Sequence, residues 1–433
     1  MTIVAPDVQP TPASGRAPRE RDPLYLATIA LGSSTLITAV LGLAFWAAAA
    51  RLYDTAEVGI ASAAVSAMTL LASVSQCNVA AAVVRYLPEA GRDSRRLLTG
   101  AYGITVVAGA VVGVGFATLA SGTGMGSFLA GPGWFPPLFV GAVVVGTIFV
   151  VQDSALVALR AAGVVPVENG VFALVKLVLL VALARTKLFG AVFVAWAIAM
   201  AGAVAAVSGL VFRRLLPTQA NDGNTIDGGF RRVASFTAGT YVGNVVQIGT
   251  NALVPLIVTA ELGVRQTALF YPAWVVVMTL EALLASLGTA ITAEGARDTR
   301  QVGKLVWQAR RIALIVLLPG LAVIGLGAPT LLSVFGHQYS VHAATVLRLF
   351  VVGAGIRIAV AVGLAVARIR EQVGPIVVTN TVSSIALVGV AWALIPRFGL
   401  PAAGLAYVVE QVVAIGCIAP ALRRETALPG SAT

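Results

Sequence analysis

The chain has 433 residues, of which 58% are hydrophobic and only 11% are charged, and its mean hydropathy is +0.93. Soluble domains carry about 25% charged residues, so this composition excludes a soluble globular protein. The net charge of +11 does not indicate a nucleic-acid-binding protein, because the basic residues cluster at the ends of apolar runs, where they orient membrane helices. The two cysteines, Cys77 and Cys417, lie inside apolar runs and do not indicate a disulfide framework.

In chain order, residues 1–22 are rich in Pro, Arg and small residues, which predicts a disordered cytoplasmic tail. The first apolar run is too long for the hydrophobic region of a signal peptide, so we expect an uncleaved span. Runs of about 20 apolar residues indicate helices rather than barrel strands. The predicted fold is an all-α polytopic membrane protein with twelve transmembrane helices, at 24–50, 58–84, 101–120, 138–160, 165–184, 188–212, 233–258, 266–292, 305–333, 343–367, 374–395 and 399–421.

Lys and Arg set the orientation. With the N-terminus inside, 21 of the 29 Lys and Arg residues fall in predicted cytoplasmic segments and six in outer segments. This bias places both termini in the cytoplasm. The longest polar segment splits the spans six and six, so we expect a cytoplasmic tail (1–22), an N-lobe (23–212), a cytoplasmic linker (213–232), a C-lobe (233–422) and a second cytoplasmic tail (423–433).

The two lobes carry similar short sequence motifs in the same order. T-A-E-V-G at 55–59 returns as T-A-E-L-G at 259–263, each expected in the outer loop after the first span of its lobe. The segments 158–169 and 188–196 resemble 367–380 and 397–407, so the offsets run from about 204 to 211. These matches predict two parallel six-helix lobes related by a pseudo-two-fold axis along the membrane normal. When positions are counted from the two T-A-E motifs, Gln76 of the N-lobe and Glu281 of the C-lobe are expected to be equivalent.

Polar residues repeat at helical spacing in the second, seventh and eighth spans. Lipid offers them no hydrogen bonds, so these faces should turn toward other helices or a water-filled cavity. For the serines, close helix packing is the competing explanation, whereas three large amides on one face favour a cavity. The predicted cavity lining is Ser62, Ser66, Thr69, Ser73 and Gln76 from the second span, Thr240, Asn244, Gln247 and Asn251 from the seventh, and Tyr271, Trp274 and Glu281 from the eighth.

Charged residues also lie inside the spans. Each would cost about 2.5–3.5 kcal/mol at the bilayer centre if it faced lipid, so they should be paired or hydrated. Pairing within a lobe is one alternative, either Arg357 with Glu410 or Lys176 with Asp153. Glu281 has no cation in its own span and is expected in the cavity.

Three cations and three acids have candidate roles at the site. We add Lys176 and Arg357 to the cavity lining, together with Arg85, which ends the second span and either orients the helix or meets an anionic headgroup. The candidates for binding a coupling ion are Glu281, Glu410 and Asp153.

No catalytic or metal-binding pattern emerges. The chain lacks a phosphate-binding loop, and its two histidines, His337 and His342, share one outer loop without a nearby carboxylate or cysteine. We therefore expect no metal, no cofactor and no enzymatic activity. A membrane glycan polymerase or ligase is the enzyme alternative, and the short outer loops disfavour it.

Three motifs are informative together. A-R-L-Y-D-T-A-E-V-G-I-A-S-A (50–63) contains the pattern R-L-x-x-x-x-x-x-G, formed by Arg51, Leu52 and Gly59. Arg85 and Tyr86 close the second span, and F-G-L-P-A-A-G-L-A-Y (398–407) leads into the last span. These motifs resemble those of bacterial polysaccharide and oligosaccharide flippases, within the multidrug/oligosaccharidyl-lipid/polysaccharide (MOP) exporter superfamily.

The resemblance implies a V-shaped transporter of the bacterial plasma membrane, with a cavity lined by the first, second, seventh and eighth spans. It implies alternating access and a cargo of polyprenyl-diphosphate-linked glycan, moved from the inner to the outer leaflet. Membrane lipids, a coupling proton or sodium ion, and glycan polymerase or glycosyltransferase partners follow from it.

The polar stripes are rich in amides and hydroxyls, whereas family cavities are often cationic, so Arg85, Lys176 or Arg357 would have to meet the headgroup. The second alternative is a multidrug extrusion antiporter of the same superfamily, with a smaller cavity and acidic groups in the N-lobe.

Overall fold

The computed structural model describes residues 40–120, 122–219, 250–297, 303, 307, 308, 311 and 313–423. Within these residues, nine helices are long and apolar enough to cross a membrane. Three shorter apolar helices, Val40–Leu52, Thr250–Leu262 and Ala313–Leu326, occupy the positions of the predicted first, seventh and ninth spans. The all-helical class is confirmed, while the count of twelve spans and the cytoplasmic termini stay predictions.

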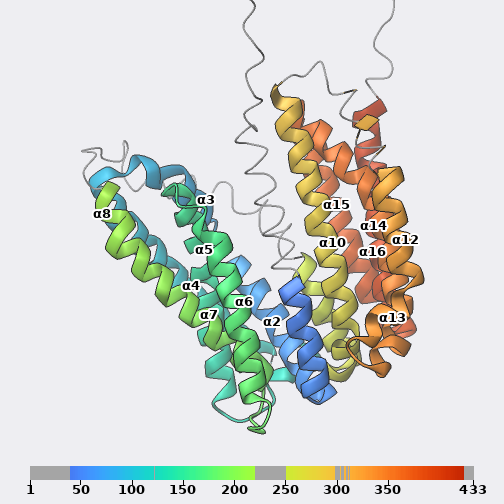
Figure 1. Ribbon diagram of the computed structural model, residues 1–433, viewed down its shortest axis with the longest axis horizontal. Helices are drawn as coiled ribbons and strands as arrows, with labels where there is room; N and C mark the ends of the chain where they lie inside the picture. The colour runs from blue at the N-terminus through green and yellow to red at the C-terminus, as the bar shows by residue number, and fades with distance from the viewer. Residues whose placement is uncertain are drawn as a thin grey trace, which may run out of the picture.

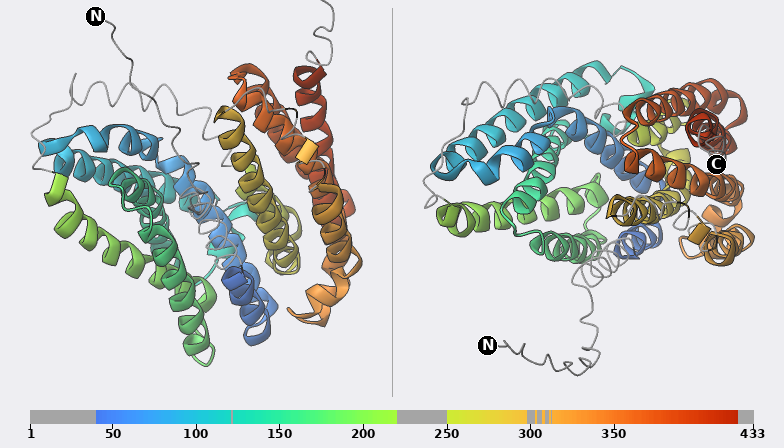
Figure 2. Two further views of the ribbon diagram at one scale, coloured as in Figure 1. Left: turned by 45° about the horizontal axis from the view of Figure 1, so that its top comes forward. Right: turned by 90° about the horizontal axis from the view of Figure 1, so that it is seen from above.

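The helices form two bundles (Figures 1 and 2). The N-lobe contains α2 (Thr55–Ser75), α3 (Val79–Tyr86), α4 (Ser94–Ala120), α5 (Phe135–Ala158), α6 (Val164–Leu183), α7 (Ala191–Leu210) and α8 (Leu216–Gln219), with a short 3₁₀ helix, η3 (Gly124–Leu129), before α5. The C-lobe contains α10 (Val264–Arg297), α12 (Leu318–Leu326), α13 (Ala328–Ser333), α14 (His337–Ile369), α15 (Val373–Phe398) and α16 (Leu400–Arg423). The Val40–Leu52 helix belongs to the N-lobe and the Thr250–Leu262 helix to the C-lobe.

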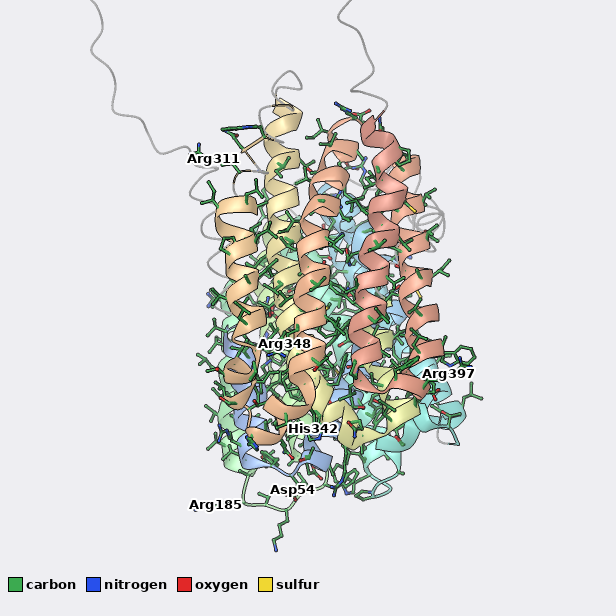
Figure 3. All side chains as sticks on the ribbon, turned by 90° about the vertical axis from the view of Figure 1, so that its right-hand side faces the viewer. Asp54, Arg185, Arg311, His342, Arg348 and Arg397 are labelled. Carbon is green, nitrogen blue, oxygen red and sulfur yellow. The ribbon has the colours of Figure 1, made fainter. Side chains whose placement is uncertain are left out.

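The bundles touch at one end and diverge toward the other, so that together they form a V (Figure 1). The contact runs through α2 and α10, and we call this end of the molecule the junction end. Asp54, Arg185 and His342, all from predicted outer segments, lie near the junction end, whereas Arg311 lies toward the opposite end (Figure 3). These three residues, expected on one side of the membrane, therefore lie at the end of the molecule opposite to Arg311.

The predicted second span is broken, so the expectation of one continuous helix over 58–84 was wrong. Helix α2 ends at Ser75 and α3 begins at Val79. Between them, Cys77 and Asn78 both have left-handed backbone angles, with φ of 49° and 58°. Asn adopts this region more readily than most residues, but a run of two such residues ends a helix. The sixth span differs in the other direction, because its helical backbone continues through α8 to Gln219, into the predicted linker.

Two of the three repeated segments occupy equivalent places in the lobes. Helices α5 and α14 end alike, with left-handed Arg160 and Glu371 at φ of 57° and 56°. Each is followed by the N–H to C=O bond across five residues that characterises a Schellman turn, at 2.8 and 2.9 Å. Gly190 and Gly399, with φ of 65° and 67°, then precede α7 and α16. The offsets are 211 at the first turn and 209 at the second.

The two T-A-E motifs do not occupy equivalent places in the lobes, so the predicted match between them was wrong. Thr55 begins α2, whereas Thr259 lies in the last turn of the preceding helix, Thr250–Leu262. The equivalent helix starts are Thr55 and Val264, 209 positions apart. Short motifs recur by chance in a chain so rich in Ala, Val and Gly.

The same correction changes the proposed match between polar positions. At an offset of 209, Glu281 corresponds to Ala72 rather than to Gln76. The predicted equivalence of Gln76 and Glu281 was therefore wrong.

Candidate functional site

A small polar cavity lies inside the C-lobe, between the Thr250–Leu262 helix and helices α10, α14, α15 and α16. Its volume is about 70 Å³. A water needs about 10–15 Å³, so the cavity has room for a few. Its polar lining consists of Thr250, Asn251, Glu281, Arg357, Thr379, Asn380, Ser383, Ser384, Tyr407, Glu410 and Gln411.

Glu281 is held by two partners from other helices. Arg357 of α14 donates from Nε to Glu281 Oε2 at 2.8 Å, and the Tyr407 hydroxyl of α16 donates to Oε1. The side chains of Arg357 and Glu281 are 23% and 17% exposed. Arg357 thus forms its ion pair with Glu281, and the alternative pair between Arg357 and Glu410 is not the one that the structure contains.

Glu410 lies beside this pair, close enough to interact electrostatically with both Glu281 and Arg357. Its own hydrogen-bond partner is the neighbouring Gln411 side chain. Among the described residues, the cluster has two carboxylates and one guanidinium, which leave one negative charge if both acids are ionised. An uncompensated charge inside a membrane protein is costly, so the cluster favours binding one proton or one monovalent cation.

The cluster belongs to one lobe only. At the offset of 209, the N-lobe counterparts of Glu281, Tyr407 and Glu410 are Ala72, Ile198 and Ala201. Counted back from the end of α14, where the offset is 211, Arg357 corresponds to Gly146. Pseudo-symmetric packing therefore does not require these polar groups, which indicates a role specific to the C-lobe.

The predicted stripe of α2 lies mainly in a helix-packing surface. Ser62, Ser66 and Ser73 are buried, and each hydroxyl donates to a carbonyl of its own helix at 2.8–3.0 Å. Thr69 is exposed and donates to the Val65 carbonyl, while Gln76 is buried where α2 ends. This arrangement supports the packing explanation for the serines.

Tyr271 and Trp274 are buried in different places. The Tyr271 ring lies 4.5 Å from the Trp46 ring of the N-lobe, and its hydroxyl bonds with Ser66, so Tyr271 joins the two lobes. Trp274 packs against Phe350, with ring centroids 5.7 Å apart, inside the C-lobe core. Of these two aromatic residues, Tyr271 belongs to the contact between the lobes and Trp274 does not.

Lys176 is enclosed by aromatic rings rather than paired with Asp153. Its Nζ lies 3.8, 4.7 and 5.1 Å from the ring centroids of Trp196, Phe172 and Phe45. A cation over a ring face gains about 0.5–2 kcal/mol. Within the described residues Lys176 forms no ion pair.

Asp153 instead lies near a second acid, in a polar group of the N-lobe. Gln152 donates to Glu168 Oε1 at 2.7 Å and accepts from Ser208 at 3.0 Å. Asp153 interacts electrostatically with Glu168, and within the described residues one oxygen of each acid lacks a hydrogen-bond partner.

Arg85 lies apart from these groups. It is exposed at the end of α3 and pairs with Glu89. Asn251 lines the C-lobe cavity, whereas Thr240, Asn244 and Gln247 lie outside the described residues.

Sequence reasoning missed Tyr407 and the polar face of α15. The T-N-T-V-S-S run at 379–384 was a usable signal, because it supplies four of the cavity's side chains. Tyr407 gave no such signal, since it reads as an interfacial aromatic residue in an apolar helix.

Comparisons with solved structures give matches along almost the whole chain. An inward-facing multidrug resistance MATE family transporter of the MOP superfamily has a TM-score of 0.67 and 15% identity, covering 94% of this chain and all of that chain. The lipid II flippase MurJ, in an inward closed conformation, has a TM-score of 0.73 and 10% identity, covering 91% of this chain and 87% of that chain. A MOP superfamily transporter from Pyrococcus furiosus has a TM-score of 0.60 and 15% identity, covering 93% and 96%.

No protein-family model matches the sequence, and no curated protein matches it. The identities of 10–15% are too low to carry a substrate across, but the coverage and the TM-scores define the architecture. Together with the nine apolar helices, they make this a multi-pass membrane protein with the fold of the MOP superfamily transporters.

Proposed function

We propose that the protein is a flippase, which moves a lipid-linked oligosaccharide or polysaccharide precursor across the bacterial plasma membrane by alternating access. The observation that carries this proposal is the pair of pseudo-symmetric lobes that touch at one end and diverge at the other (Figure 1). The inward-facing MATE structure is more similar, with a TM-score of 0.67, than the outward-facing one, at 0.59. Both observations support an inward-facing state, with the junction end outside.

For the anionic headgroup of the cargo, Lys176 is the best of the three predicted cations. Arg85 is paired with Glu89, and Arg357 with Glu281. Lys176 is enclosed by rings that adjoin Trp46, and Trp46 in turn contacts Tyr271 of the other lobe. In the outward-opening step, separation of the lobes at Trp46 would open this region to the diphosphate, while the lipid tail stays in the bilayer.

We expect Lys176→Met to lower flippase activity about tenfold or more, because the loss of a charge-assisted contact to phosphate costs about 1.5–3 kcal/mol. The same change should leave the melting temperature of the detergent-purified protein almost unchanged, since Met fills similar space among the rings. Transport is measured in proteoliposomes with a polyprenyl-diphosphate-linked oligosaccharide. Arg85→Met, at an exposed and already paired cation, is the matched control. Equal activity in the two variants would contradict the role of Lys176.

For the coupling ion, we propose the C-lobe cluster, with Glu281 and Glu410 sharing one proton or sodium ion. The charge balance of the cluster supports this assignment. Asp153 of the N-lobe is the third candidate, and it would act with Glu168. Glycan polymerases or glycosyltransferases in the same membrane would supply or consume the cargo.

The direct test is deletion of the gene in its host. A flippase predicts that a lipid-linked glycan accumulates on the cytoplasmic leaflet and that the cell envelope loses the corresponding polymer. Accumulation is measured by the accessibility of the glycan to an added glycosidase in inside-out and right-side-out vesicles. Unchanged glycan on both leaflets would exclude the proposed cargo.

The second candidate is a multidrug extrusion antiporter, and the N-lobe acids favour it. Asp153 and Glu168 carry unpartnered oxygens within the described residues, and acidic N-lobe groups suit small cationic substrates. In this case the deletion strain should become sensitive to cationic dyes, and purified protein should exchange dye for protons. The two outcomes separate the candidates.

A further inference from the structure

Arg51 and Gln338 donate three side-chain hydrogen bonds between the lobes at the junction end. Arg51, at the end of the Val40–Leu52 helix, reaches α13 of the C-lobe: its Nη2 donates to the Ser333 carbonyl at 2.7 Å and its Nε to the Val334 carbonyl at 2.9 Å. Gln338, in the first turn of α14, donates from Nε2 to Thr55 Oγ1 at 2.9 Å, at the start of α2. All three cross from one lobe to the other.

The chemistry of these contacts suits a reversible joint. The last carbonyls of a helix accept no hydrogen bond from N–H groups of the same helix, so they are open to other donors. The forked guanidinium of Arg51 donates to two carbonyls where α13 ends. The donors Arg51 and Gln338 are exposed, so water can replace each bond when the lobes part. Exposed hydrogen bonds of this kind bias an equilibrium without fixing it.

The pseudo-symmetry supplies a second, different joint. Shifting Arg51 and Ser333 by 209 gives Ala260 and Gly124, and these two residues also meet across the lobes. Here the contact is backbone against backbone: a Cβ on Gly124 would lie 2.3 Å from the Ala260 carbonyl oxygen. One side of the junction is therefore polar, and the equivalent side is close-packed.

We infer that Arg51, with Gln338, forms a latch that holds the junction end closed, and that the lobes open outward by breaking these bonds while turning about the packed Gly124–Ala260 joint. The inference rests on the alternating access proposed above. It assigns to Arg51 a role in the balance between the two states, separate from any contact with cargo. Removal of the latch should shift the population toward the state in which the junction end is open.

The test measures distances between the lobe tips, by which we mean the ends of the two lobes at the junction end. Arg185 and His342, both exposed near the junction end, are replaced by Cys and spin-labelled, with Cys77 and Cys417 changed to Ser (Figure 3). A second labelled pair, at Arg213 and Val373, reports on the diverging end. Distance distributions are recorded by double electron–electron resonance in nanodiscs without cargo.

In Arg51→Ala we expect the population with separated tips to rise roughly fivefold, with a matching rise in shorter distances at the diverging end. Gln338→Ala should give a smaller rise, and Arg51→Lys should lie between Arg51→Ala and the parent. The matched control is Arg348→Ala, because Arg348 donates to the Gly325 carbonyl within the C-lobe at 3.4 Å. That variant should keep the parental distribution.

Parental distances in Arg51→Ala would overturn the latch, as would an equal shift in Arg348→Ala. The measurement needs no cargo, so it separates the two proposals. If the tips separate in Arg51→Ala but no lipid-linked glycan is transported, the latch stands and the proposed cargo fails.

Discussion

Replacing Arg357 with Met is expected to destabilise the protein by about 3 kcal/mol or more, the usual cost of removing one partner of a largely buried ion pair. Among the described residues, Glu281 would lose its cation and would lie beside a second acid, Glu410. The double variant Glu281→Gln with Arg357→Met should recover most of this stability, because it removes both charges. Thermal unfolding in detergent, followed for the single and double variants, measures the recovery.

A transport assay should separate the role of this cluster in stability from its role in binding the coupling ion. Glu281→Gln keeps the size of the side chain and should leave membrane insertion intact, but ion-driven transport should be lost, since the cluster then has one carboxylate fewer to bind the ion. Counterflow in proteoliposomes, with and without a proton or sodium gradient, measures this. Transport by Glu281→Gln that responds normally to the gradient would show that the cluster is only a structural ion pair.

Gly59→Ala is expected to have the second large effect. A Cβ at Gly59 would lie 1.9 Å from the Val264 carbonyl oxygen, on the backbone of the other lobe, so the junction end cannot close around it. We expect transport to fall at least tenfold, with the Arg185 and His342 tips held apart. Both activity in proteoliposomes and the tip distances test this.

The matched control for Gly59→Ala is Gly115→Ala in α4. No described residue lies within 4 Å of a Cβ built at Gly115, and Ala is favoured over Gly in a helix by about 1 kcal/mol. The control should therefore keep its transport and gain slightly in stability. Normal transport by Gly59→Ala would mean that the lobes do not need this close approach.

Hydropathy predicted the helices well because lipid forces each span to satisfy its own backbone hydrogen bonds, a strong and local constraint. The break after α2 escaped, since Gln76, Cys77 and Asn78 include neither of the usual helix breakers, Gly and Pro. The internal repeat was found, but the offset between its two halves was taken from the T-A-E motifs. These motifs lie on opposite sides of the turn between two helices, so the offset was wrong by several residues.

The charges in the spans were identified correctly, but their partners were not. Glu281 and Arg357 are 76 positions apart, and which of two acids an arginine meets depends on how α10, α14 and α16 pack. The same holds for Lys176, whose rings come from three helices. One sequence shows that a membrane charge needs a partner, and only the packing shows which partner it has.

The reciprocal contacts at the junction end have a consequence for how the chain can vary. Position 51 meets position 333, and its counterpart at 260 meets the counterpart of 333 at 124. This exchange is the pattern of an isologous interface, in which two identical subunits present the same patch to each other. In a true homodimer both joints would have to carry the same residues. Because the two halves share one chain, one joint is free to be an arginine with carbonyls and the other a glycine packed on backbone, and a change at either joint is not copied to the other.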